Sequence, residues 1–130
     1  MLFRSEYRTR SGSADTATAG FSFGGVAAFF LGWQNPTCFG AVGSISGGFW
    51  ALRLAEQLPS ESKLRLRIYL DSGDDNYEDN RALRDALLGL GYAEGDELRY
   101  LHRRGHGHRA DHFAQGFVEL LRFQIGRAHV

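Results

Sequence analysis

The stretch that decides the fold is TATAGFSFGGVAAFFL, residues 16–31. A short apolar run, a glycine-rich turn and a second apolar run follow one another in it. This order predicts a strand over residues 16–20, a tight turn at Ser22 and then a buried helix. Asn35-Pro36 should end that helix, because a residue before proline disfavours the helical conformation.

The rest of the chain continues to alternate strand patterns with helix patterns. The predicted elements are a strand at 39–45, a helix near 49–57, a strand at 64–70, a helix with Leu83, Leu87 and Leu90 on one face and Gly91 at its end, a strand at 97–101, and a helix with Phe113, Phe117, Leu120 and Leu121 on one face. Residues 1–16 show no clear periodicity and should form a loop or arm. Strands separated by helices predict an α/β fold, with a mainly parallel sheet flanked by helices.

The composition fits one globular domain and argues against several classes of partner. Of the 130 residues, 43% are hydrophobic, and 15 basic residues balance 15 acidic ones. A net charge of zero gives no field that would attract nucleic acid or an anionic membrane, so we expect neither as a partner. With no long apolar stretch and no signal-peptide pattern at Met1, we expect a soluble chain. The single Cys38 excludes an intrachain disulfide and is expected to be a small buried hydrophobe.

Gly20-Phe21-Ser22-Phe23-Gly24 matches the nucleophile-elbow pattern G-x-S-x-G. In such an elbow, a serine stands on a strand-to-helix turn with its hydroxyl clear of the sheet. Small residues on either side leave room for the strained backbone, and the helix amino terminus favours a developing oxyanion. The pattern is short, so the predicted strand before it and helix after it carry much of its weight.

A serine elbow requires an acid after a later strand and a histidine after the next one, and both follow in that order. The acidic turn supplies Asp71, Asp74 or Asp75, and the loop after the last predicted strand supplies His106 or His108. The histidine would accept the serine proton, while the acid would hold the histidine in the correct tautomer. The three signals together favour a hydrolase.

Several segments resemble the putative-esterase family of α/β-hydrolases, which includes esterase D-like, enterochelin-esterase-like and feruloyl-esterase-like enzymes. The resemblance covers about Tyr7 to Phe123. It rests on residues 19–25 (AGFSFGG), residues 36–42 (PTCFGAV) with Ser46-Gly47, residues 68–73 (IYLDSG), residues 80–87 (NRALRDAL) and residues 105–108 (GHGH).

This resemblance implies a Ser22–Asp75–His108 triad that hydrolyses a small-molecule carboxylic ester through an acyl-enzyme, with no cofactor and no metal. The backbone N–H of Phe23, the residue after the nucleophile, would be an oxyanion donor. Phe113 falls where such relatives often carry a tryptophan near the histidine, although a position in the helix core explains it as well.

The resemblance also implies that several strands and a second oxyanion donor precede the elbow, where only about 16 residues stand before the first predicted strand. We therefore expect residues 1–124 to be the C-terminal half of an esterase domain. Residues 125–130 (IGRAHV) look like a translated sequencing adapter, and we expect them to be a non-native tail.

Other functions are compatible with parts of the sequence. His102, His106, His108 and His112 could form a metal cluster, but their spacing matches no zinc template. The glycine-rich turn lacks the Gly-Lys-Ser/Thr of a phosphate-binding loop. An acyltransferase would use the same triad with a different acceptor, and a non-catalytic α/β-hydrolase-like module would use only the fold.

Overall fold

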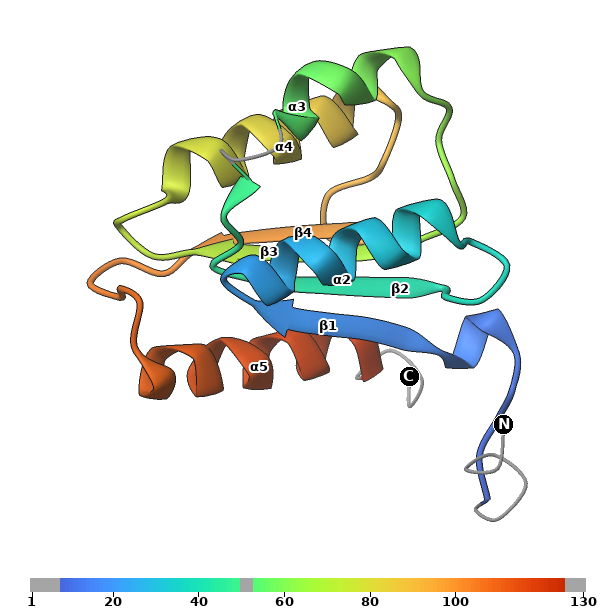
Figure 1. Ribbon diagram of the computed structural model, residues 1–130, viewed down its shortest axis with the longest axis horizontal. Helices are drawn as coiled ribbons and strands as arrows, with labels where there is room; N and C mark the ends of the chain where they lie inside the picture. Colours follow the sequence, from blue (N-terminus) through green and yellow to red (C-terminus); the bar gives the residue numbers. More distant parts are fainter. Residues whose placement is uncertain (1–7, 50–52, 126–130) are drawn as a thin grey trace.

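Four parallel strands form one sheet in the order β1-β2-β3-β4 in the computed structural model, which describes residues 8–49 and 53–125 (Figure 1). The strands are β1 (Ala17–Phe21), β2 (Ala41–Ile45), β3 (Arg67–Ser72) and β4 (Leu98–His102). Phe21 pairs with Ile45, Ile45 with Asp71 and Asp71 with Leu101. The carboxyl ends of all four strands therefore lie at one edge of the sheet.

The helices cover both faces of this sheet. Figure 1 shows α2 (Phe23–Gln34), α3 (Leu54–Gln57) and α4 (Tyr77–Gly89) on one face and α5 (Ala110–Ile125) on the other. Short 3-10 turns occur at η1 (Ser13–Asp15) and η3 (Leu58–Ser60). Each of α2, α3 and α4 lies in the crossover between two consecutive strands, as parallel pairing requires. The predicted α/β fold with a parallel, helix-flanked sheet is confirmed.

Alternation along the strands divides the core into two parts. On β3, Ile68 and Leu70 face the larger cluster under α2 and α4, whereas Tyr69 faces α5. The smaller cluster consists of Ile45, Tyr69, Leu120 and Phe123. All three of these β3 side chains are fully buried, because β3 is an inner strand with helices on both sides.

The strands predicted at 16–20, 39–45 and 97–101 begin one or two residues later in the structure, and two other predicted elements begin three or more residues later. β3 begins at Arg67 rather than at residue 64, because the hydroxyl of Tyr92 hydrogen-bonds both the N–H and the C=O of Leu64 and so occupies groups that a sheet ladder would need. The helix predicted near 49–57 is the single turn Leu54–Gln57, and residues 50–52 lie outside the described part of the chain.

The predicted apolar face of the last helix is partly wrong. α5 buries Gly116, Leu120 and Phe123, whereas Phe117 and Leu121 are exposed. The buried positions follow one another at i, i+4 and i+7. The face predicted from the large apolar residues is therefore rotated about the helix axis relative to the buried face, which includes Gly116.

The expectation that Cys38 is buried is also wrong, since this thiol is exposed. It lies in the turn between α2 and β2, beyond the cover of either core cluster. Within residues 8–49 and 53–125, no helix combines the length and hydropathy that a membrane crossing needs.

Candidate active site

Ser22 stands at the turn from β1 to α2 with φ of 57° and ψ of −126°, a backbone conformation rarely seen outside glycine. Its N–H donates to the carbonyl of Ile45 (2.9 Å), and its own carbonyl accepts from the N–H groups of Gly25 (3.0 Å) and Gly48 (3.4 Å). These bonds from the adjacent strand and helix stabilise the strained turn. It has the geometry of a nucleophile elbow.

The two glycines of the motif are not equivalent. A Cβ on Gly20 would lie 2.3 Å from the carbonyl oxygen of Gly24, so that position requires glycine. A Cβ on Gly24 would meet no described atom within 4 Å. The sequence prediction that both glycines make room for the elbow therefore holds for Gly20, while the described residues give no steric reason for Gly24.

The structure brings Ser22, His108 and Asp75 together. Ser22 Oγ lies 3.1 Å from His108 Nε2, and His108 Nδ1 lies 2.5 Å from Asp75 Oδ2. The loop at 103–109 runs from the end of β4 to the elbow after β1, and these two strands lie at opposite edges of the sheet. The side chains of His108 and Asp75 are 43% and 42% exposed, so the arrangement is open to solvent in the described part of the chain.

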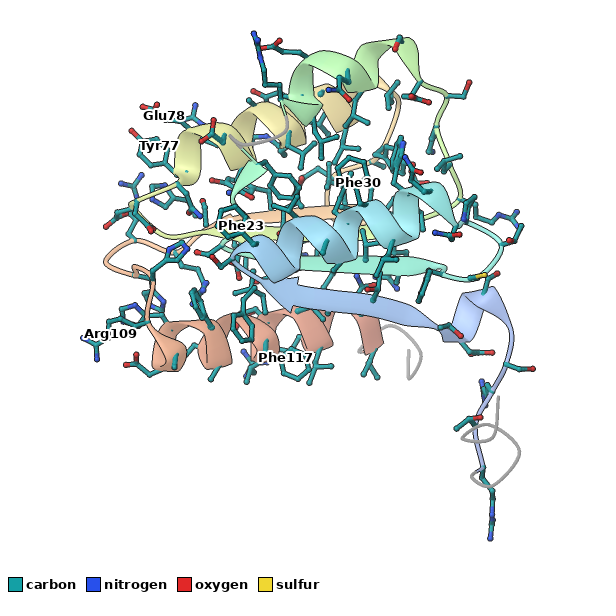
Figure 2. The ribbon with its side chains drawn as sticks, in the orientation of Figure 1. Phe23, Phe30, Tyr77, Glu78, Arg109 and Phe117 are labelled. Atoms are coloured by element: carbon teal, nitrogen blue, oxygen red, sulfur yellow. The ribbon has the colours of Figure 1, made fainter. Side chains whose placement is uncertain are left out.

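Phe23, the residue after Ser22, is the first residue of α2. Its backbone N–H therefore lies at the amino end of that helix, where the helix dipole favours negative charge. Its side chain is 63% exposed, and Figure 2 shows it at the same end of the sheet as Tyr77 and Arg109.

Asp74 was an alternative candidate for the acid, and it has other partners. Its Oδ1 lies 2.8 Å from His102 Nε2, and its Oδ2 accepts from the N–H of Gly105 (2.8 Å). The hydrogen bond from Gly105, followed by that from His102, holds the pKa of Asp74 below its usual value. The ring of His102 also stacks on Tyr77 with centroids 4.8 Å apart. Asp74 thus fixes the loop that carries His108 without reaching that ring.

Asp71, the third candidate acid, lies in β3 rather than in a turn and is fully buried. It accepts hydrogen bonds from the Tyr69 hydroxyl (2.7 Å), the Ser46 N–H (2.9 Å) and Arg103 Nε (3.1 Å). Burial raises the pKa of Asp71, and the donors that converge on its two oxygens oppose that rise. Burial also raises the pKa of Tyr69, so the phenol keeps its proton and donates a hydrogen bond to Asp71.

His106, the alternative histidine, contacts Arg103 and His112. Its Nδ1 lies 2.6 Å from Arg103 Nη1, and its ring stacks on His112 with centroids 4.3 Å apart. Burial, followed by the charge of Arg103 and the neighbouring His112, holds the pKa of His106 below its usual value. Since guanidinium is a donor only, Nδ1 of His106 is the acceptor and carries no proton.

In the described ranges, no group of three or more His, Cys, Asp or Glu side chains could hold a metal ion, and this includes the histidine-rich segment. His102 pairs with Asp74, His108 with Asp75, and His106 with His112.

Phe113 on α5 contacts the site directly. Its ring meets the ring of His108 edge to face (centroids 5.4 Å apart, interplanar angle 83°) and stacks on Phe21 at 4.8 Å. Together with Phe21, Ala110, Ala114 and Phe117, it lines an apolar pocket of about 360 Å³ beside the elbow. Phe113 therefore belongs both to the packing of the helix and to the surroundings of His108.

Sequence reasoning missed Arg103 and the pairing of Asp74 with His102. Arginine is abundant throughout this chain, so nothing in the sequence distinguishes Arg103 from the other arginines. Asp74 and Asp75 are adjacent, so the sequence does not show which of them pairs with His102. A weak signal was available: Arg103 directly follows β4, and Asp71 on the neighbouring strand pairs with Leu101, two residues before Arg103.

The chain is similar in sequence and in fold to known esterases. A family described as "Putative esterase" matches residues 2–124. The enterochelin esterase from Shigella flexneri is 26% identical, with a TM-score of 0.80 over 98% of this chain and 35% of its own. A ferulic acid esterase (18% identity, TM-score 0.79, 95% of this chain and 56% of its own) shares the fold.

A curated relative, the uncharacterized protein YbbA of Bacillus subtilis strain 168, is 25% identical over 121 residues, covering 83% of this chain and 48% of its own length. The chain thus spans about half the length of this curated relative and about a third of the enterochelin esterase.

Proposed function

Because the chain belongs to the Putative esterase family, we propose that it carries the nucleophile, base and acid of a serine carboxylic-ester hydrolase acting on a small-molecule ester. One observation carries the proposal: Ser22 Oγ, His108 and Asp75 form a continuous hydrogen-bonded chain of 3.1 and 2.5 Å. A non-catalytic module of the same fold would have no need to keep a strained serine, a histidine and a carboxylate in this contact.

The proposed reaction follows from the proton positions that the hydrogen bonds among Ser22, His108 and Asp75 require. With its proton on Nδ1 and directed to Asp75, His108 has a free lone pair on Nε2 and accepts the proton of Ser22 as Oγ attacks the ester carbonyl. The tetrahedral intermediate collapses when Nε2 returns that proton to the leaving alcohol, which leaves an acyl group on Ser22. Water then attacks the acyl-enzyme with His108 as base, the bond between the acyl group and Ser22 Oγ breaks, and Nε2 returns the proton to Oγ as the carboxylic acid is released.

The negative charge that develops on the carbonyl oxygen needs hydrogen-bond donors. The N–H of Phe23 is the donor that we assign, because it follows the nucleophile and lies at the amino end of α2. The proposed reaction requires no metal and no cofactor.

A fluorophosphonate probe tests the proposal, because it labels a serine only where a base has activated it. In protein with any natural flanking sequence retained, we expect the label on Ser22, mapped by peptide mass spectrometry. Ser22→Ala should abolish labelling and lower kcat for p-nitrophenyl acetate by roughly a million-fold, as loss of the nucleophile does in other triads.

Ser60→Ala is the matched control, because Ser60 is an exposed serine whose hydroxyl donates to a local carbonyl, that of Gln57. It should leave labelling and turnover unchanged. Labelling of a different serine, or a Ser22→Ala variant that keeps its turnover, would contradict the proposal. Product analysis with an added alcohol distinguishes hydrolysis from acyl transfer, since both share the acyl-enzyme.

A further inference from the structure

Arg103 lies at the centre of the contacts that hold the His108 loop. It is the first residue after β4, and its backbone N–H donates to the carbonyl of Ser72 (2.8 Å) on the neighbouring strand. Its side chain is 10% exposed and donates through Nε to the buried carboxylate of Asp71. This pair anchors the beginning of the loop in the core.

The same guanidinium reaches both the loop and the helix that follows it. Arg103 Nη1 donates to His106 Nδ1 (2.6 Å) and to the carbonyl of His112 (2.7 Å). His112 in turn accepts from the N–H of Gly107 through its Nδ1 (2.9 Å). The two residues before His108 and the first turn of α5 after it are thereby fixed to one buried group.

Helix α5 has a glycine, Gly116, where it packs against the Asp71–Arg103 ion pair. A Cβ on Gly116 of α5 would lie 2.6 Å from Asp71 Oδ2 and 2.8 Å from Arg103 Nη2. A helix that packs a glycine against an ion pair allows its backbone to approach the charges closely. The buried carboxylate also accepts from Tyr69 and from the N–H of Ser46 at the end of β2, so it is itself rigidly held.

We propose that Arg103 is a positioning residue for His108: it fixes the loop from which the imidazole reaches Ser22, through its bonds to Asp71, His106 and the carbonyl of His112. This inference rests on the proposed triad. The loop must cross the ends of two strands between β4 and the elbow, and a displacement of about 1 Å at a catalytic group can cost 10²-fold in rate. A planar fork that bonds three partners at once suits this task, whereas lysine offers a single point charge.

The test compares Arg103→Met, Arg103→Lys and the control Arg104→Met in protein with any natural flanking sequence retained. Arg104 is the exposed neighbour in the same loop. The first readout is the low-field proton resonance of His108 Nδ1–H, assigned by its loss in Asp75→Asn. The second is the division of the effect between kcat and KM in ester hydrolysis. Circular dichroism and thermal unfolding show that each variant is folded at the assay temperature.

For Arg103→Met we expect a broadened or absent resonance and a kcat that is roughly 10- to 100-fold lower with KM within two-fold, because the base is misplaced rather than the substrate site. Arg103→Lys should fall between this variant and the wild type, and Arg104→Met should match the wild type. A folded Arg103→Met protein with an intact resonance and unchanged kcat would overturn the proposal.

His106→Leu keeps the test decisive if Arg103→Met does not fold. It removes the acceptor on the loop while leaving the buried Asp71–Arg103 pair intact, and it should weaken the same resonance and lower kcat. An unchanged resonance in this variant would contradict the role of the loop contact. If fluorophosphonate fails to label Ser22 while the resonance still depends on Arg103, the proposed function fails and the positioning role stands.

Discussion

Two adjacent aspartates at the end of β3 differ in what they hold. Asp75 contacts the ring of His108, whereas Asp74 contacts His102 and the N–H of Gly105. Both carboxylates stabilise the same pair of loops, but only one of them touches the proposed base. Replacing each of the two carboxylates by the isosteric amide therefore tests which of them acts as the acid.

Asp75→Asn should lower kcat by roughly 10⁴-fold, because asparagine would stabilise the wrong tautomer of His108. Asp74→Asn is the isosteric control at the neighbouring position and should change kcat far less. Steady-state ester hydrolysis at saturating substrate measures both. A dead Asp74→Asn enzyme beside an active Asp75→Asn enzyme would show that the acid has been assigned to the wrong residue.

The unprotonated state of His106 links the stability of the protein to pH. Its folded-state pKa lies below the ordinary imidazole value, so the unfolded chain binds a proton more readily than the folded one. The stabilising contribution is thus present above about pH 6.5 and is lost as pH falls through the folded pKa.

We expect urea unfolding to show a decline in stability from pH 7 to pH 5 that is smaller in His106→Gln, which cannot take up a proton there. The charged and titratable groups that act on His106 are Arg103, His112, Asp71 and Asp111, and all remain in the variant. Comparison at pH 8 gives the baseline. An identical decline in both proteins would assign the proton uptake to another group.

At the scale of elements, the turn from β1 to α2 depends on one glycine of its motif far more than on the other. Gly20→Ala should destabilise the protein by about 1–3 kcal/mol, because its Cβ would overlap the backbone of Gly24. Gly24→Ala should be neutral or stabilise by up to about 1 kcal/mol, because alanine replaces glycine in open space within a helix. Free energies of unfolding from urea titration measure both.

The elements that sequence patterns predicted well were those determined by local signals. Asn35-Pro36 ends α2, and Gly91, with φ of 104°, follows the end of α4. The elements that were predicted poorly depend on distant partners. Tyr92 removes Leu64 from the sheet, and Gly116 of α5 is buried against a carboxylate from β3, so neither outcome was visible in the surrounding residues.

The same distinction applies to the candidate site. The order serine, acid, histidine indicated which loops would meet, because parallel strands end at one edge. Which aspartate and which histidine lie in contact with each other beside Ser22 depends on hydrogen bonds that Arg103, His102 and Gly105 make across the fold. Such tertiary contacts have no fixed sequence spacing.

At the scale of the whole molecule, β1 lies at the edge of the sheet, and no other strand in residues 8–49 and 53–125 pairs with its outer side. Phe21 at its end and Phe117 of α5 are 55% and 46% exposed and line one apolar pocket. Open edge strands and contiguous apolar patches favour association with other chains.

We expect residues 1–130, expressed alone, to self-associate and to hydrolyse p-nitrophenyl acetate poorly. Phe117→Lys should raise the monomeric fraction in sedimentation velocity. Leu88 of α4 is 40% exposed and does not line that pocket, so Leu88→Lys should have little effect. A monodisperse wild-type chain with strong turnover that depends on Ser22 would contradict this prediction.

The route of the His108 loop has a consequence for how activity appears during folding. Ser22 and His108 are 86 residues apart in the sequence, and His108 and Asp75 are 33 apart. The entropic cost of bringing two segments together grows with the length of chain between them, and contacts between distant residues slow the search for the native state. Helices can form early from local signals, but Ser22 and His108, which follow the first and the last strand of the sheet, should meet only after all four strands have aligned. In a refolding experiment, helical circular dichroism should therefore recover first, and reactivity of Ser22 toward the fluorophosphonate should follow as a separate, slower phase.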